Sequence, residues 1–387
     1  MTLDIIREET VGCTDKIFLS SAGGSLMPKS VVETMINHIF LEQQHGAYES
    51  ADRKSEHLSQ FYTEAARLIN TRPDNIAFAI SSTDAYAKAL SSIEFKEEDY
   101  IVTTNDDYVS NQIAFLSLQK KRGVNFIRVK NLPDHELDLE DLENLIKKYN
   151  PKLVAVTYVP TNSGLIQNVE GVGKICRQYD VLYLVDACQA VGQLVVDVNK
   201  IGCDFLTATG RKFMRGPRGT GFLYVSDRVL EKNMAPVFLD MAGAEWTDFD
   251  DYTLLGTAKR FELWETSVSS VLGFTEALKY ANEIGMQNIE NYNKKLAESL
   301  RTGLQNKGFR VLDQGQNLCS IITFCAHDSS IDHIYRILKE NNVYFSVSNK
   351  SNALIDFTMK NLDRAIRLSP HYFNTAEEIN EVVKMLK

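Results

Sequence analysis

The side chains best suited to chemistry follow two apolar segments near the middle of the chain. Asp186 ends the segment VLYLVD, and Lys212 follows the segment DFLTAT together with Thr209 and Arg211. If both segments are parallel strands, their carboxyl ends meet at one edge of a sheet, where ligands of open α/β folds bind. A carboxylate, an amine, a guanidinium and a hydroxyl would then lie together, and this set suits a phosphorylated ligand.

These residue types match what pyridoxal phosphate (PLP) requires. The cofactor needs a lysine for a Schiff base, an anion that keeps its pyridine nitrogen protonated, and donors for its phosphate. Lys212, Asp186, and the pair Thr209 and Arg211 supply these groups in turn. A single lysine or aspartate is usually a solvated surface group, but the D-x-x-Q, T-G-R-K-F and G-P-R-G-T-G motifs occur here in order, after matching apolar segments. The sequence therefore predicts a PLP site in which Lys212 and Asp186 are catalytic.

On these motifs the chain resembles the class V aminotransferase and cysteine desulfurase-like family of fold type I PLP enzymes, over nearly its whole length. The resemblance implies that Lys212 carries the cofactor, that Asp186 pairs with the pyridine nitrogen, and that Gln189 hydrogen-bonds the phenolic oxygen. Ser82 and Thr83 begin a predicted helix and are similar to the family's phosphate loop, which agrees with the affinity of helix N-termini for anions. The expected cofactor-binding residues are Ser82, Thr83, Tyr108, Thr161, Asp186, Gln189, Thr209, Arg211 and Lys212.

Two further segments resemble the substrate side of that family's site. The turn that begins Thr161-Asn162 is similar to the one along the cofactor edge, and Arg367 is similar to the arginine that binds a substrate α-carboxylate. A planar guanidinium is the natural partner of that group. Many family members place a histidine over the pyridine ring, where a strict register here gives Val109. We favour the neighbouring Tyr108 for a stacking or gating role.

The reaction is left open by the fold, because transamination, racemisation and elimination all begin from the same bound state. Persulfide-forming cysteine desulfurases need a mobile cysteine, yet segment 344–353, where it is expected, contains serines and no cysteine. This segment and the later HYFNT resemble hercynylcysteine-sulfoxide lyases and isopenicillin-N-epimerase-like proteins. Our first prediction is a C–S lyase that performs α,β-elimination on a cysteine S-conjugate or its sulfoxide. An aminotransferase or epimerase acting on an amino acid is the alternative, and a persulfide-forming desulfurase or a non-catalytic ligand-sensing scaffold ranks lower.

Short β-branched segments alternate with helix-length amphipathic segments between residues 76 and 225, which predicts a doubly wound sheet. The strand candidates are IAFAI, YIVTT, VNFIRV, KLVAVTYV, VLYLVD, DFLTAT and GFLYV, and the helices between them are expected at 84–93, 109–122, 139–149 and 169–179. The predicted fold is α/β, with a large, mixed, mostly parallel seven-stranded sheet and a smaller α+β region. We expect an N-terminal arm over 1–20, the large PLP-binding domain over 21–262 and the small domain over 263–387.

Composition excludes several classes of protein. The 387 residues are 44% hydrophobic and carry 42 basic against 51 acidic side chains, a net charge of −9 that argues against a nucleic-acid partner. No segment approaches the roughly 18 apolar residues of a spanning helix, so we expect no membrane partner and a cytoplasmic protein. Six isolated cysteines and unclustered histidines indicate neither a disulfide framework nor a metal site. The resemblance implies a homodimer that acts on a small amino-acid substrate.

Overall fold

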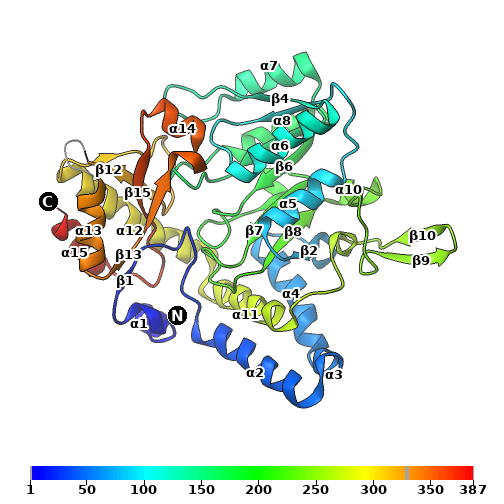
Figure 1. Cartoon of the computed structure of the whole chain (residues 1–387), viewed down its shortest axis with the longest axis horizontal. Coiled ribbons are helices and arrows are strands. Elements are labelled where there is room, and N and C mark those ends of the chain that lie inside the picture. Colours follow the sequence, from blue (N-terminus) through cyan, green and yellow to red (C-terminus); the bar gives the residue numbers. More distant parts are fainter. Residues whose placement is uncertain (1, 327–330, 387) are drawn as a thin grey trace.

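A seven-stranded sheet forms the centre of the computed structural model, which describes residues 2–326 and 331–386 (Figure 1). Its strand order is β2-β8-β7-β6-β5-β3-β4, and β8 runs antiparallel to both neighbours while the other pairs are parallel. The strands are β2 (Ile76–Ala79), β3 (Tyr100–Thr103), β4 (Asn125–Arg128), β5 (Leu153–Thr157), β6 (Leu182–Asp186), β7 (Phe205–Thr209) and β8 (Gly221–Val225). All seven predicted strands and the mixed, mostly parallel arrangement are confirmed.

Helices cover both faces of this sheet because its strands are apolar on both sides. Successive strand residues alternate between two buried clusters: Ile76 and Phe78 belong to one, Ala77 and Ala79 to the other. The helices that follow the strands are α5 (Ser82–Ser91), α6 (Val109–Arg122), α7 (Leu139–Tyr149), α8 (Val169–Gln178), α9 (Val198–Ile201) and α10 (Asp227–Glu231). The four helices predicted here are therefore present, with ends that differ by at most two residues from the expected ones.

A second, four-stranded antiparallel sheet lies in the C-terminal part and has the order β11-β12-β15-β14. Its strands are β11 (Arg310–Val311), β12 (Ile322–Cys325), β14 (Ser346–Asn349) and β15 (Arg364–Leu368). The helices of this part are α11 (Val268–Ile284), α12 (Met286–Asn306), α13 (Ile331–Glu340), α14 (Leu354–Met359) and α15 (Ala376–Met385), with the short helix η4 (Lys350–Asn352) before α14. Thr375 and Glu378 form a capping box at the start of α15.

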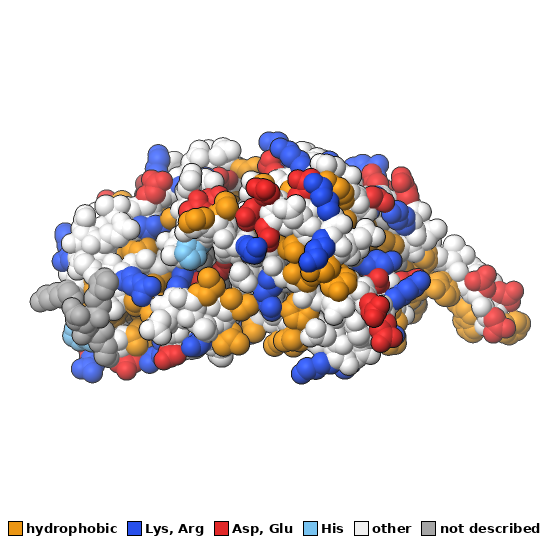
Figure 2. Space-filling view, turned by 90° about the horizontal axis from the view of Figure 1, so that it is seen from above, with side chains coloured by type: hydrophobic (Ala, Val, Ile, Leu, Met, Phe, Trp, Pro, Cys, Tyr) orange, Lys and Arg blue, Asp and Glu red, His pale blue; other side chains and the backbone are white. Residues whose placement is uncertain are grey.

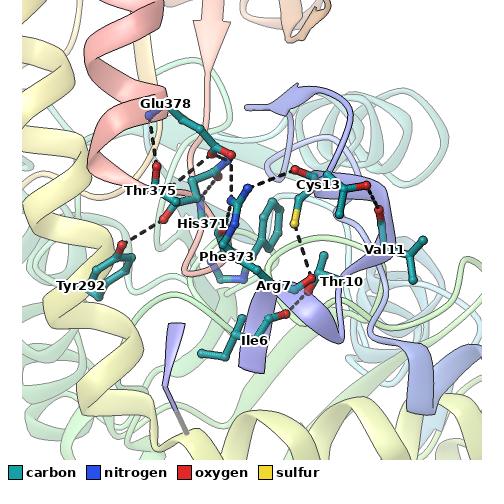
Figure 3. A network of polar contacts seen from close by, with 12 residues as sticks. Ile6, Arg7, Thr10, Val11, Cys13, Tyr292, His371, Phe373, Thr375 and Glu378 are labelled. Carbon is teal, nitrogen blue, oxygen red and sulfur yellow. Dashed lines mark hydrogen bonds and ion pairs between the residues drawn. The ribbon is translucent and has the colours of Figure 1, made fainter. Parts of the chain in front are cut away.

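The N-terminal segment is packed against the C-terminal part. It contains α1 (Leu3–Glu8), η1 (Val11–Cys13) and β1 (Ile17–Phe18), and β1 pairs in parallel with β13 (Val343–Tyr344). Arg7 donates to Glu378 at 2.7 Å, to the Phe373 carbonyl at 2.8 Å and to the Cys13 carbonyl at 3.2 Å (Figure 3). The predicted arm is thus an ordered part of the fold.

Several elements were not predicted, and two parts of the chain that include such elements carry exposed apolar surface. Helix α2 (Lys29–His45) leads into α3 (Ala47–Asp52) and α4 (Ser55–Leu68), and a hairpin of β9 (Ala244–Asp248) and β10 (Asp251–Leu254) projects from the body at the right of Figure 1. Both carry exposed apolar side chains, Phe40 on α2 and Trp246 on β9 among them. None of the helices among the described residues is both long and apolar enough to cross a membrane.

Candidate active site

An inner cavity of about 70 Å³ lies at the carboxyl ends of β5, β6 and β7 and at the start of α5. This is the edge at which open α/β sheets bind ligands. Its walls are formed by Ser81, Ser82, Thr83, Tyr108, Asn111, Thr157, Val159, Thr161, Asp186, Cys188, Gln189, Thr209, Arg211 and Lys212. All nine residues expected at the cofactor therefore surround one space.

Asp186 is the last residue of β6 and is 4% exposed. One carboxylate oxygen accepts from the Cys188 amide and the other from the Asn111 side chain, each at 3.0 Å. Burial raises the pKa of Asp186, whereas these two hydrogen bonds and the charge of Lys212 act in the opposite direction. The carboxylate is thus held rigidly, with lone pairs left for a further donor.

A second buried carboxylate, Asp107, lies behind Asp186 and was not predicted. Asn111 bridges the two, because its amide also donates to Asp107 at 3.0 Å. Asp107 accepts further hydrogen bonds from the hydroxyls of Thr103, at 2.7 Å, and of Thr157. Burial raises the pKa of Asp107 as well. The sequence carried only a partial signal, since Asp107 and Asn111 are four residues apart around the start of the predicted helix 109–122, which does not indicate the contact with Asp186.

Lys212 lies in the turn that follows β7 and is 7% exposed. Its Nζ is 3.3 Å from the Cys188 sulfur and 5.9 Å from the centre of the Tyr108 ring. Tyr108, rather than Val109, contributes to the inner cavity, where it precedes α6. The amine therefore points into the cavity between a thiol and an aromatic face.

The start of α5 supplies polar groups at one end of the inner cavity. Ser81 caps this helix by accepting from the Asp84 amide, and the first amides of a helix have no partner within it. Gly221 of β8 passes close by: a Cβ there would lie 3.1 Å from the Ser81 carbonyl carbon and 3.2 Å from the Ser82 nitrogen. With the hydroxyls of Ser82, Thr83 and Thr209, this end forms a cradle for an anion.

An outer cavity of about 230 Å³ adjoins the inner one, and Tyr108, Thr161, Arg211 and Lys212 line both. Arg367, on β15, lies in its wall and donates to the Thr161 carbonyl at 2.9 Å and hydroxyl at 2.7 Å. The Arg367 Nε is buried and unpartnered. Burial, with the charge of Arg211 adding to it, lowers the pKa of Arg367 to about 10. A buried guanidinium with a free donor is suited to an incoming carboxylate.

Two amide side chains complete the site. Gln189 donates to the Ala22 carbonyl at 3.0 Å and to the Thr161 hydroxyl at 2.9 Å, and its buried Oε1 has no partner. Asn162 lines the outer cavity, but its amide donates to Asp356 of α14 at 2.5 Å. Asp356 also forms a buried ion pair with Lys360 at 2.7 Å.

These donor and acceptor groups fit PLP. A carboxylate, an amine and an anion cradle lie at three places around one cavity, and unpartnered polar atoms of Gln189 and Arg367 face the same region. An unpaired buried polar atom costs about 1–3 kcal/mol, so a ligand that pairs with these two atoms would gain binding free energy. Asp186 would hold the pyridine nitrogen, Lys212 the aldehyde carbon, and the start of α5 the phosphate. The fold and this site define a fold type I PLP-dependent enzyme.

Comparison with known proteins agrees with this class. The family model described as aminotransferase class-V matches residues 17–382, and the chain belongs to that family. A probable cysteine desulfurase of Methanothermobacter thermautotrophicus is 29% identical over 98% of this chain and 96% of its own length. A second probable cysteine desulfurase, from Pyrococcus abyssi, is 28% identical over 99% of this chain and 96% of its own length.

Solved structures show the same fold. Apo cysteine desulfurase from Thermococcus onnurineus NA1 superposes with a TM-score of 0.90 at 25% identity and covers 98% of this chain and 96% of its own. The cysteine desulfurase CsdA of Escherichia coli also superposes with a TM-score of 0.90, at 18% identity, and covers 100% of this chain and 97% of its own. The predicted family, fold class, enzyme class and cofactor are confirmed.

The predicted ranking of the candidate reactions, however, is wrong. The C–S lyase was ranked first because segment 344–353 lacks a cysteine, but the relatives that match nearly the full length are named cysteine desulfurases. Elimination and desulfuration cleave the same bond between Cβ and sulfur and need the same cofactor site. The position of an acceptor thiol does not decide between them, since a thiol can reach the cavity from elsewhere.

Proposed function

We propose that the protein is a PLP-dependent cysteine desulfurase, which takes the sulfur from cysteine, leaves alanine and passes the sulfur to a thiol as a persulfide. The observation that carries the proposal is the arrangement of Lys212, Asp186 and Arg367 around two adjoining cavities. Full-length similarity to proteins named cysteine desulfurases supports it. The substrate would be an amino acid, because the outer cavity offers a guanidinium for its carboxylate.

The chain's own residues would divide the work by position. PLP, when bound, withdraws electrons from the substrate carbons next to the amine. Asp186 would keep the pyridine nitrogen protonated, and the Lys212 amine would move a proton at the substrate Cα. Arg367 would fix the carboxylate and so orient the substrate Cα–H bond, and Tyr108 would cover a face of the site. Orientation of this kind lowers the barrier by removing the entropy of alignment.

A product assay tests the proposal. The purified protein, incubated with L-cysteine and dithiothreitol, is expected to release alanine and sulfide in equal amounts. Borohydride reduction followed by mass spectrometry should find a pyridoxyl group on the Lys212 peptide, and Lys212→Ala should lose both the adduct and the products. Release of pyruvate and ammonia in place of alanine would overturn the proposal.

We also propose a homodimer and a division into a large domain, 21–262, and a small domain, 263–387. The division is supported by the outer cavity, whose walls combine Asn162 and Arg211 with Ser348 and Arg367. The dimer is supported by the β9–β10 hairpin, on which Trp246 is 77% and Phe249 89% exposed. Figure 2 shows apolar and acidic side chains together on this projection, at its right-hand end. Apolar surface of this kind marks a contact site, and a second copy is the natural partner of a soluble enzyme chain.

A further inference from the structure

All six cysteines of the chain belong to the described residues, and none lines the outer cavity. Five of them are buried in the interior: Cys13, Cys176, Cys203, Cys319 and Cys325. None of these five contributes to the inner cavity either. A sulfur transferred from a substrate held at Arg367 therefore finds none of these five thiols within the site.

The sixth thiol, Cys188, lies in the wall of the inner cavity but cannot move toward the outer one. Its amide is bound to Asp186 at 3.0 Å and its sulfur accepts from Lys212 at 3.3 Å. It lies two residues after Asp186, in the turn that holds that carboxylate. Burial raises the pKa of the Cys188 thiol, which keeps it protonated and weakly nucleophilic. The thiol is therefore fixed beside the cofactor-binding groups.

The outer cavity has room for a molecule from solution. Its volume is about 230 Å³, well above the roughly 10–15 Å³ that a cavity needs in order to hold one water. The wall beside Arg367 is formed by Val347, Ser348, Asn349, Asn352 and Ala353, none of which carries a nucleophilic sulfur. Ser348, the residue of β14 next to Ala365 of β15, is 8% exposed. A small polar molecule can enter here without displacing a side chain of the chain's own.

We propose that the sulfur acceptor is a small-molecule thiol that binds in the outer cavity, rather than a cysteine of this chain. The inference rests on the proposed desulfurase function. The acceptor thiolate attacks the substrate sulfur, so an S–S bond forms as the Cβ–S bond breaks. The electron pair of that bond stays with the carbon, which takes up a proton, and the net change is cysteine plus thiol to alanine plus persulfide. No oxidant or reductant is required.

A single-turnover experiment tests this step. The PLP-loaded protein is held in excess over L-cysteine, so that a second cysteine rarely acts as acceptor, and alanine is measured with and without 2-mercaptoethanol. We expect alanine only when the thiol is present, at a rate that saturates with its concentration, and 2-mercaptoethanol persulfide as the co-product. The intact protein mass is expected to show no added sulfur. Cys188→Ser is expected to keep the dependence on added thiol.

Two variants provide the converse test. Ser348→Cys changes one atom and places a thiol in the cavity wall, so it should form alanine without added thiol and carry one extra sulfur atom on the β14 peptide. Ser55→Cys, at an exposed position on α4, is the matched control and should behave as wild type.

The outcomes separate the two proposals. Alanine without added thiol, with an extra sulfur on any native cysteine, would overturn the external acceptor and leave the desulfurase function intact. A Ser348→Cys variant that still depends entirely on added thiol would also overturn it, because the acceptor would then act elsewhere. No alanine from cysteine at any thiol concentration would overturn the desulfurase proposal itself.

Discussion

Asn111 links the two buried carboxylates beneath the proposed cofactor site. It donates to Asp186 and to Asp107 at 3.0 Å each, so it stabilises the ionised form of Asp186 that a protonated pyridine nitrogen requires. Because a hydrogen bond to a charged group contributes about 1.5–3 kcal/mol, its loss should be visible in catalysis.

We therefore predict that Asn111→Leu lowers kcat by about one order of magnitude and raises the pKa of Asp186. The measurement is a pH titration of the bound cofactor's absorbance, which a purely structural role would leave unchanged. Gln112→Leu is the control, since Gln112 contacts Asp107 at 3.3 Å but not Asp186. An unaltered titration in Asn111→Leu would show that Asp186 needs no such support.

Asp106, the residue directly before Asp107, gives a prediction for stability. Burial, with the nearby charge of Asp356 adding to it, raises the pKa of Asp106 to about 6. An unfolded aspartate titrates near 3.9, so between these values the folded chain binds a proton that the unfolded chain lacks. The free energy of unfolding therefore falls as pH rises through this window. Above the window, the buried and ionised Asp106 carboxylate lowers this free energy by about 3 kcal/mol, which is the penalty for its burial.

Asp106→Asn should remove that penalty, because the amide oxygen can still accept from Asn131. Denaturant unfolding should find the variant more stable than wild type at pH 8, and the gain should be about 2 kcal/mol smaller at pH 4.5. Asp74→Asn, at an exposed carboxylate, is the control. A gain that is equal at both pH values would mean that Asp106 titrates normally.

Single residues were predictable where a motif fixed their place after a strand. Lys212, Asp186 and Gln189 follow strands that the sequence already indicated, and the structure places all three at one cavity. Asp107 and Asn111 were missed because no motif marks them, and a hydrogen bond to Asp186, 75 residues away from Asn111, has no local signature.

A hydrogen bond links helix α14 to the loop that follows β5 of the large sheet. Asn162, after β5, donates to Asp356, and α14 directly follows segment 346–353 in the wall of the outer cavity. This contact fixes the position of that wall relative to Arg367.

We predict that Asn162→Ala raises KM for cysteine by about tenfold while kcat changes little, because the wall is displaced and the reacting groups are not. Hydrogen exchange of the α14 amides should become faster in the same variant. Asn352→Ala, a change in the same wall that leaves the Asp356 contact intact, serves for comparison. If kcat falls and KM is unchanged, Asn162 acts on the reaction itself.

Elements with a strong pattern were predicted and elements without one were not. Strands β2 to β8 are apolar and bounded by turns, and α6 and α7 begin and end as expected. Helix α2 was missed because Ile36, Ile39 and Phe40 are exposed, so its apolar residues do not mark a buried face. The β9–β10 hairpin was missed for the same reason, since its side chains do not pack on the chain's own core.

That hairpin gives a prediction for the assembly. Replacing both Trp246 and Phe249 by Asp should halve the mass measured by light scattering, because two charges would be buried without partners at the proposed interface. Circular dichroism should remain that of wild type, since neither side chain contributes to the core. Leu132→Asp, at another exposed apolar position, should leave the mass unchanged. A dimer that survives the double substitution would place the interface elsewhere.

The N-terminal segment has a consequence for how this protein is made. Ser20 bonds the Ser346 hydroxyl, 326 positions later, and the Ala22 amide bonds the Ser369 hydroxyl, 347 positions later, while the carbonyls of Ala22 and Gly23 accept from Gln189 and Arg211. During synthesis, residues 17–24 emerge from the ribosome long before these partners, and a large α/β sheet can form behind them in the meantime. Closing so long a loop is slow. Nascent chains stalled before residue 346 should therefore be cleaved by protease near residue 20, while the sheet of β2 to β8 already resists.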